Sequence, residues 1–121
     1  MPSTSPTQRA LAECRKRGWQ SQVVEYWLAP ARRRIDLFGC IDILALDGES
    51  GSLGIQVTSG SGHSARVKKS LAEPRIREWV RAGNRFEVWS YAKRGPVGKR
   101  KVWTLRVQRL ELEQFEDQPN G

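Results

Sequence analysis

The order of apolar and polar positions along the chain predicts a helix, then strands, then helices, then strands again. A Ser5–Gln8 capping box, apolar residues at helical spacing and a terminating glycine predict a helix over residues 5–17. Further helices are predicted over 63–72 and, restarting at Pro74, over 74–83. Aromatic and β-branched runs predict strands over these ranges: 19–28, 35–46, 53–58, 85–91 and 101–107.

This element order is typical of an α/β or α+β domain built on a mixed central sheet. With 121 residues, the chain is expected to form a single domain over 1–121. Gly39 predicts a bend inside the run 35–46, and the residues 47–51 have strong turn chemistry. The tail from residue 111 is acidic and is expected to be frayed.

Two carboxylates, Asp36 and Asp42, interrupt the apolar run 35–46. A lone carboxylate in a buried strand is costly unless it is paired, hydrogen-bonded or bound to a metal. If a three-residue loop centred on Glu49 closes the hairpin, Asp42 lies opposite Gln56. A loop of two or four residues would set Asp42 against Val57 instead, so the prediction depends on register.

In the first register the hairpin has a polar face and an apolar face. The polar face carries Asp42, Gln56 and Thr58. The apolar face is expected to carry Ile41, Ile43, Ile55 and Val57. Oxygen ligands on a sheet face suit Mg²⁺ or Mn²⁺, with Asp42, the Gln56 side chain and the Val57 carbonyl as candidate ligands. The alternative is that Asp42 is only a strand-edge residue hydrogen-bonded to backbone.

Composition narrows the functional classes. The 21 Lys and Arg residues against 13 Asp and Glu give a net charge of +8, which favours nucleic acid as partner, with an anionic membrane surface second. Cys14 and Cys40 alone make neither a disulfide scaffold nor a thiolate zinc site, and His63 is the only histidine. No apolar run is long enough for a membrane helix and no secretory signal is recognised, so a cytoplasmic protein is expected.

The segments GCIDILAL at 39–46 and GIQVT at 54–58 resemble the core of the PD-(D/E)XK nuclease superfamily. The resemblance covers roughly residues 5–92 and implies a restriction-endonuclease-like αβββαβ fold. Within the superfamily the chain looks most like Holliday-junction resolvases and small phage-type nucleases. This implies a bacterial or phage-encoded endonuclease that uses Mg²⁺ or Mn²⁺ to cut branched or otherwise structured DNA. A homodimer is also expected, because two symmetric cuts need two sites, and the strand at 86–91 is a candidate interface.

The resemblance also implies roles for single residues. Asp42 matches the metal-binding aspartate of the superfamily, and Gln56 stands at the position of its second carboxylate. Glu13 matches the additional acidic ligand of resolvase-like members. Thr58 replaces the superfamily lysine, so a cation must come from elsewhere if the protein cuts DNA. Arg66 or Lys69, on the following helix, is the expected replacement.

Basic side chains outside this core are expected to contact the DNA backbone. The predicted contacts are Arg32, Arg33, Arg34, His63, Lys68, Lys93, Arg94, Lys99 and Arg100. Most of the five tryptophans are expected in the core, but an exposed one could stack on an unpaired base. Two other functions fit the sequence: a nucleic-acid-binding module that has lost its chemistry, and a protein-binding regulator of a nucleic-acid enzyme.

Overall fold

The structure is a computed structural model that describes residues 4–116. It is a mixed α/β fold with a central five-stranded sheet in the order β1-β4-β5-β6-β7 and a separate two-stranded ribbon, β2–β3. Its elements in chain order are α1 (Pro6–Lys16), β1 (Gln20–Val23), β2 (Tyr26–Leu28), η1 (Ala29–Ala31), β3 (Arg33–Ile35), β4 (Ile43–Leu46), β5 (Leu53–Ser59), η2 (Gly60–Gly62), α2 (His63–Leu71), α3 (Pro74–Arg81), β6 (Arg85–Arg94), β7 (Val102–Arg109) and α4 (Leu112–Glu116).

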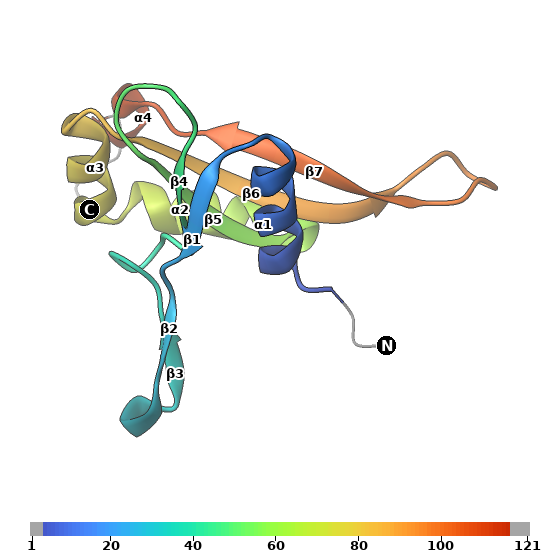
Figure 1. Cartoon of the computed structure of the whole chain (residues 1–121), viewed down its shortest axis with the longest axis horizontal. Coiled ribbons are helices and arrows are strands. Elements are labelled where there is room, and N and C mark those ends of the chain that lie inside the picture. The colour runs from blue at the N-terminus through green and yellow to red at the C-terminus, as the bar shows by residue number, and fades with distance from the viewer. Residues whose placement is uncertain (1–3, 117–121) are drawn as a thin grey trace.

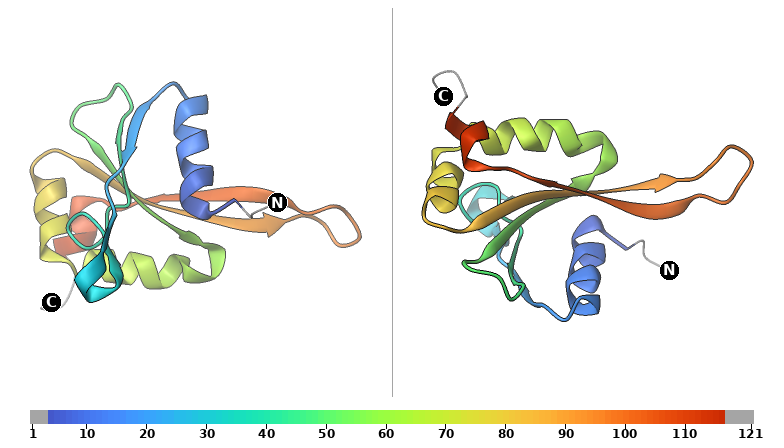
Figure 2. Two further views of the ribbon diagram at one scale, coloured as in Figure 1. Left: turned by 60° about the horizontal axis from the view of Figure 1, so that its bottom comes forward. Right: turned by 90° about the horizontal axis from the view of Figure 1, so that it is seen from above.

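The sheet mixes both pairing modes. β5 and β6 are parallel, and α2 and α3 make the crossover that a parallel pair requires. The other neighbouring strands are antiparallel. Figure 2 shows α1 on one face of the sheet and α2 on the other. Helices therefore cover both faces of the central strands β5 and β6, as expected for an α/β architecture, whereas the edge strands β1 and β7 are more exposed.

Each face of the sheet has its own core. Under α1, the buried residues Ala10 and Cys14 pack with Ile43, Ile55 and Trp89. The helix starts as predicted, because Ser5 Oγ accepts a hydrogen bond of 3.1 Å from the Gln8 amide and Pro6 occupies the first turn. The second core lies on the opposite face and has these buried members: Cys40, Ile41, Ile76, Phe86, Val88, Leu110 and Phe115.

The hairpin register is confirmed. Ile43 pairs with Ile55 and Ala45 with Leu53, the register that a three-residue loop requires. The prediction that Ile41 shares the face of Ile43 is wrong. Ile41 belongs to the opposite core and packs so closely on Gly54 that an added Cβ there would lie 2.8 Å from its Cδ1. The chain bends between residue 41 and β4, so strand alternation does not extend back to Ile41.

The predicted strands 19–28 and 35–46 are each broken. Val24 N–H donates to the Asp42 carbonyl at 2.8 Å, directly beyond the Val23–Ile43 pair that ends the ladder between β1 and β4. The chain then leaves the sheet, forms the β2–β3 ribbon and returns through a loop to β4. Figure 1 shows this ribbon projecting from the body of the molecule. Arg32, Arg33 and Arg34, which are predicted DNA contacts, form the far end and the returning strand of that ribbon.

Two further expectations are corrected. Residues 111–116 are not frayed, because α4 packs Phe115 into the core, while 117–121 lie outside the described residues. The strand at 86–91 does not offer a dimer interface, since β6 lies inside the sheet and Phe86, Val88 and Trp89 are fully buried. None of the helices within residues 4–116 combines the length and apolar character needed to cross a membrane.

Candidate metal and phosphate site at the sheet edge

Asp42 lies just before β4 and is only 4% exposed. Its Oδ2 atom accepts one hydrogen bond of 2.7 Å from Gln56 Nε2 and another of 2.8 Å from the Val57 amide. The Val57 amide is free to donate to a side chain because β4 pairs with β5 only as far as Ile55. β5 itself continues to Ser59. The Asp42 carboxylate thus accepts the hydrogen bond that a neighbouring strand would otherwise accept from the Val57 amide. The prediction that Asp42 faces Gln56 is confirmed.

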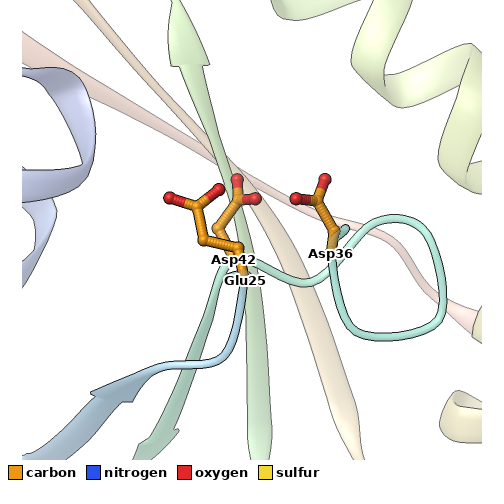
Figure 3. Close-up of side chains that lie close together, drawn as sticks. All are labelled: Glu25, Asp36 and Asp42. Atoms are coloured by element: carbon orange, nitrogen blue, oxygen red, sulfur yellow. The ribbon is translucent and has the colours of Figure 1, made fainter. Parts of the chain in front are cut away.

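Two more carboxylates join Asp42. Carboxylate oxygens of Glu25, Asp36 and Asp42 all lie within 4.8 Å of one another, and Figure 3 shows the three groups pointing to the same side. Glu25 directly precedes β2 and Asp36 directly follows β3, so closing the ribbon brings both to Asp42. Asp36 was recognisable in the sequence as a carboxylate that interrupts an apolar run, but no role was predicted for it, and Glu25 was not predicted at all. Their shared signal was a carboxylate within a run of strand-forming residues.

The electrostatics of this cluster favour a bound cation. The pKa of Asp42 is raised to about 8, mainly because the carboxyl is buried. The neighbouring Asp36 and Glu25 carboxylates contribute to this rise, whereas the hydrogen bond from the Val57 amide opposes it. Three clustered carboxylates repel one another, and one of them is desolvated. A divalent cation would relieve both costs at once, so these three carboxylates are the groups that could hold one.

Gln56 provides a second and independent indication. Its side chain is 1% exposed, and Nε2 is committed to Asp42. Its Oε1 atom has no hydrogen-bond partner among the described residues. An unsatisfied buried carbonyl costs about 1–3 kcal/mol, and an amide oxygen is a hard ligand of the kind Mg²⁺ accepts. The Val57 carbonyl points to the same side as the Val57 amide, toward Asp42, because the two groups of one strand residue share an edge.

These groups line a hollow of about 320 Å³ together with cationic side chains. Its lining residues are Thr7, Glu25, Arg34, Asp36, Asp42, Gln56, Val57, Arg66 and Lys69. Arg66 and Lys69 come from α2, and neither forms an ion pair within residues 4–116. The two candidates for the missing lysine are therefore in the hollow of Asp42. Lys68 is exposed on the same helix but does not line it.

Two predicted site residues lie elsewhere. Glu13 forms an ion pair of 2.7 Å with Arg17 and lines a separate hollow beside Tyr91 and Trp103, so its assignment as a ligand with Asp42 is wrong. The reason is its place in α1, where Thr7 is the helix residue that reaches the Asp42 hollow. Thr58 is half-buried against Gly62, where an added Cβ would come within 2.5 Å of the threonine hydroxyl, and it does not line the hollow.

His63 is not available to nucleic acid. Its side chain is 2% exposed, with Nδ1 at 2.7 Å from Ser90 Oγ and Nε2 at 2.8 Å from Gln108 Oε1. Both ring nitrogens are thus used to tie α2 to β6 and β7. The predicted DNA contact by His63 is wrong, because this side chain of α2 faces the sheet rather than solvent.

The remaining predicted DNA contacts lie on two projections. Arg32, Arg33 and Arg34 are on the β2–β3 ribbon, where Arg34 reaches Glu25 at 3.3 Å. Lys93, Arg94, Lys99 and Arg100 are exposed on the long arm formed by the distal ends of β6 and β7. Figures 1 and 2 show that this arm extends well beyond the body of the molecule. Both projections present basic side chains to solvent.

No protein-family model, curated protein or solved structure matches this chain.

Proposed function

We propose that this chain is a divalent-metal-dependent endonuclease that hydrolyses phosphodiester bonds in branched or otherwise structured DNA, on a restriction-endonuclease-like core. One observation carries the proposal. A single hollow brings together three carboxylates, the unpartnered Gln56 Oε1 and two cations of α2 that form no ion pair within residues 4–116. Carboxylates to hold a metal and cations to hold a phosphate are the groups that phosphodiester hydrolysis requires.

The element order gives further support. Without the β2–β3 ribbon, the chain runs through α1, β1, β4, β5, the crossover helices α2 and α3, and β6. With the two crossover helices counted as one helical segment, this is the αβββαβ order of the PD-(D/E)XK superfamily. Asp42 directly precedes the second strand of this core, and Gln56 lies in the third. The β2–β3 ribbon is then an insertion between the first two core strands.

The residues divide into two roles. Glu25, Asp36, Asp42, Gln56 Oε1 and the Val57 carbonyl would hold Mg²⁺ or Mn²⁺. When bound, the ion would polarise the phosphodiester and lower the pKa of a water molecule. Arg66 and Lys69 would contact the non-bridging phosphate oxygens and stabilise the charge that develops there. The two basic projections would contact the backbone in a sequence-independent and salt-dependent manner.

The test combines cleavage with metal binding. The purified chain is incubated with end-labelled four-way junctions, flaps and linear duplex in Mg²⁺ or Mn²⁺, and products are resolved on denaturing gels. We expect the wild type to cut and Asp42→Asn to lose at least about 100-fold in rate, because even outer-shell partners of a metal are worth about 10–100-fold. Glu13→Gln is the matched control and should cut like wild type, since Glu13 pairs with Arg17 instead.

Metal binding is measured separately by titrating Mn²⁺ into the DNA-free chain in a calorimeter. Heat in wild type that is absent in Asp42→Asn supports the site without reference to activity. DNA that is bound but uncut in both metals would make the chain a binding module. No DNA affinity at moderate salt, with a defined protein captured instead, would favour the regulatory alternative.

A further inference from the structure

The β2–β3 ribbon exposes two large aromatic side chains. Tyr26 is 57% exposed and Trp27 is 59% exposed, although both lie in a strand. Neither belongs to the two hydrophobic cores. Aromatic rings that a small protein leaves in solvent at adjacent positions are candidates for contact with a partner.

The charge of the ribbon indicates what that partner is. Between Tyr26 and Ile35 the sequence contains three arginines and no carboxylate. The ribbon is a separate two-stranded sheet, and an isolated hairpin of this size gains stability when something packs against it. Arginines beside exposed aromatic rings are the combination that single-stranded nucleic acid recognises, through phosphate contacts and base stacking.

Register places one of the rings near the candidate site. Trp27 is directly opposite Arg34, so the two side chains share a face of the ribbon with their Cβ atoms about 5 Å apart. Arg34 in turn reaches Glu25 at 3.3 Å and lines the hollow of Asp42. Tyr26, opposite Ile35, points to the other face. The indole of Trp27 therefore stands on the side of the ribbon that leads to the hollow.

We infer that Trp27 stacks on an unpaired base of a DNA strand whose phosphate lies in the hollow beside Asp42. A continuous duplex hides its base faces, so an exposed indole next to the cleavage site selects DNA with an unstacked nucleotide at that point. This inference rests on the proposed function for the position of the phosphate. It adds to that function a residue that sets substrate specificity and a substrate class, DNA with unpaired bases beside the cut.

The test uses the full-length Asp42→Asn chain, so that the DNA stays intact. Fluorescence anisotropy measures affinity for a duplex carrying a short unpaired stretch and for the same duplex fully paired. Adding Trp27→Ala should weaken binding to the first DNA by about 10-fold and to the second by less than about 2-fold. Tyr26→Ala is the matched control, with nearly the same exposure on the opposite face, and should change neither affinity by more than about 2-fold. Trp27→Phe keeps an aromatic ring and should restore most of the preference.

A spectroscopic readout separates stacking from a merely structural role. 2-Aminopurine at the unpaired position should be quenched on binding to Asp42→Asn, and Trp27→Ala should remove that quenching. Equal losses for both DNAs, equal effects of Trp27→Ala and Tyr26→Ala, or unchanged quenching would overturn the inference. So would a Trp27→Ala chain that changes only its oligomeric state in sedimentation. If quenching depends on Trp27 while wild type cuts nothing, the stacking stands and the proposed cleavage fails.

Discussion

The raised pKa of Asp42 makes the stability of the metal-free protein depend on pH in an unusual direction. In the folded chain this pKa is about 8, against an ordinary value of 3.8. Because the folded state binds the proton more tightly, the stability contributed by the protonated group is fully present below about pH 4. It is lost progressively as pH rises toward 8. The largest possible slope is about 1.4 kcal/mol per pH unit.

Asp42→Asn removes this dependence, because asparagine cannot ionise and its side-chain oxygen can still accept the Val57 amide. Between pH 5 and pH 7 the wild type should lose up to about 3 kcal/mol relative to the variant. For a chain of 121 residues, an unfolding entropy of about 2.1 cal/mol/K per residue converts this loss into roughly 10 °C of melting temperature. In EDTA, Asp42→Asn should therefore be the more stable protein near neutral pH.

Differential scanning calorimetry in EDTA at half-unit steps from pH 5 to 8 measures this difference. Asp47→Asn is the control. The Arg85 guanidinium lowers the pKa of Asp47 to about 2, so its titration lies below the window and its effect on stability should be constant across it. If the difference in melting temperature between wild type and Asp42→Asn stays constant from pH 5 to 8, the reasoning is refuted, because Asp42 would then be ionised at little cost.

The remaining predictions concern stability elsewhere in the fold. Gly51→Ala should cost at least about 2 kcal/mol more than Gly48→Ala in urea unfolding, because both have positive φ but only a Cβ at Gly51 would meet backbone; equal losses would contradict this. Arg109→Ala leaves the buried carboxylate of Glu87 without its ion pair and should cost about 2–3 kcal/mol, most of it recovered when Glu87→Gln is added; no recovery would argue against a charge effect. His63→Ala should lower the melting temperature by several degrees while the folded protein keeps its DNA affinity within about 2-fold, measured by anisotropy; a selective loss of affinity would show that His63 is a contact after all.

Local chemistry in the sequence was enough to predict much of the sheet and half of the candidate site. The turn residues around Glu49 left two hairpin registers open, and the structure has the one that places Asp42 against Gln56. Helical spacing likewise identified Arg66 and Lys69 as cations near this pair, and both line the hollow. These relations hold over short distances along the chain, where strand alternation and helix periodicity are reliable guides.

The other half depends on long-range geometry. Glu25 reaches Asp42 only because the chain leaves the sheet after Val23 and returns at β4. The periodicity of apolar residues does not predict where a chain leaves a sheet. Glu13 resembled a ligand by family pattern, but its neighbour one turn along, Arg17, pairs with it instead. His63 looked exposed beside a Gly-Ser segment, yet its hydrogen bonds to distant strands bury it. In each case the contacts of the side chain depend on residues remote in sequence or on the orientation of the helix or strand that carries it.

The β2–β3 ribbon leaves and re-enters the sheet at neighbouring points, since Val23 pairs with Ile43 at the place where it departs. Its interior, from Trp27 to Arg33, can therefore be exchanged for a longer, shorter or differently charged segment while β1 and β4 stay joined and Arg34 keeps its ion pair with Glu25. Glu25 and Asp36 stand at its two junctions and would be carried along unchanged. Under the proposed function, a set of grafted ribbons on this scaffold would change which DNA is bound and leave the carboxylate cluster intact, so that selectivity and chemistry could be engineered separately.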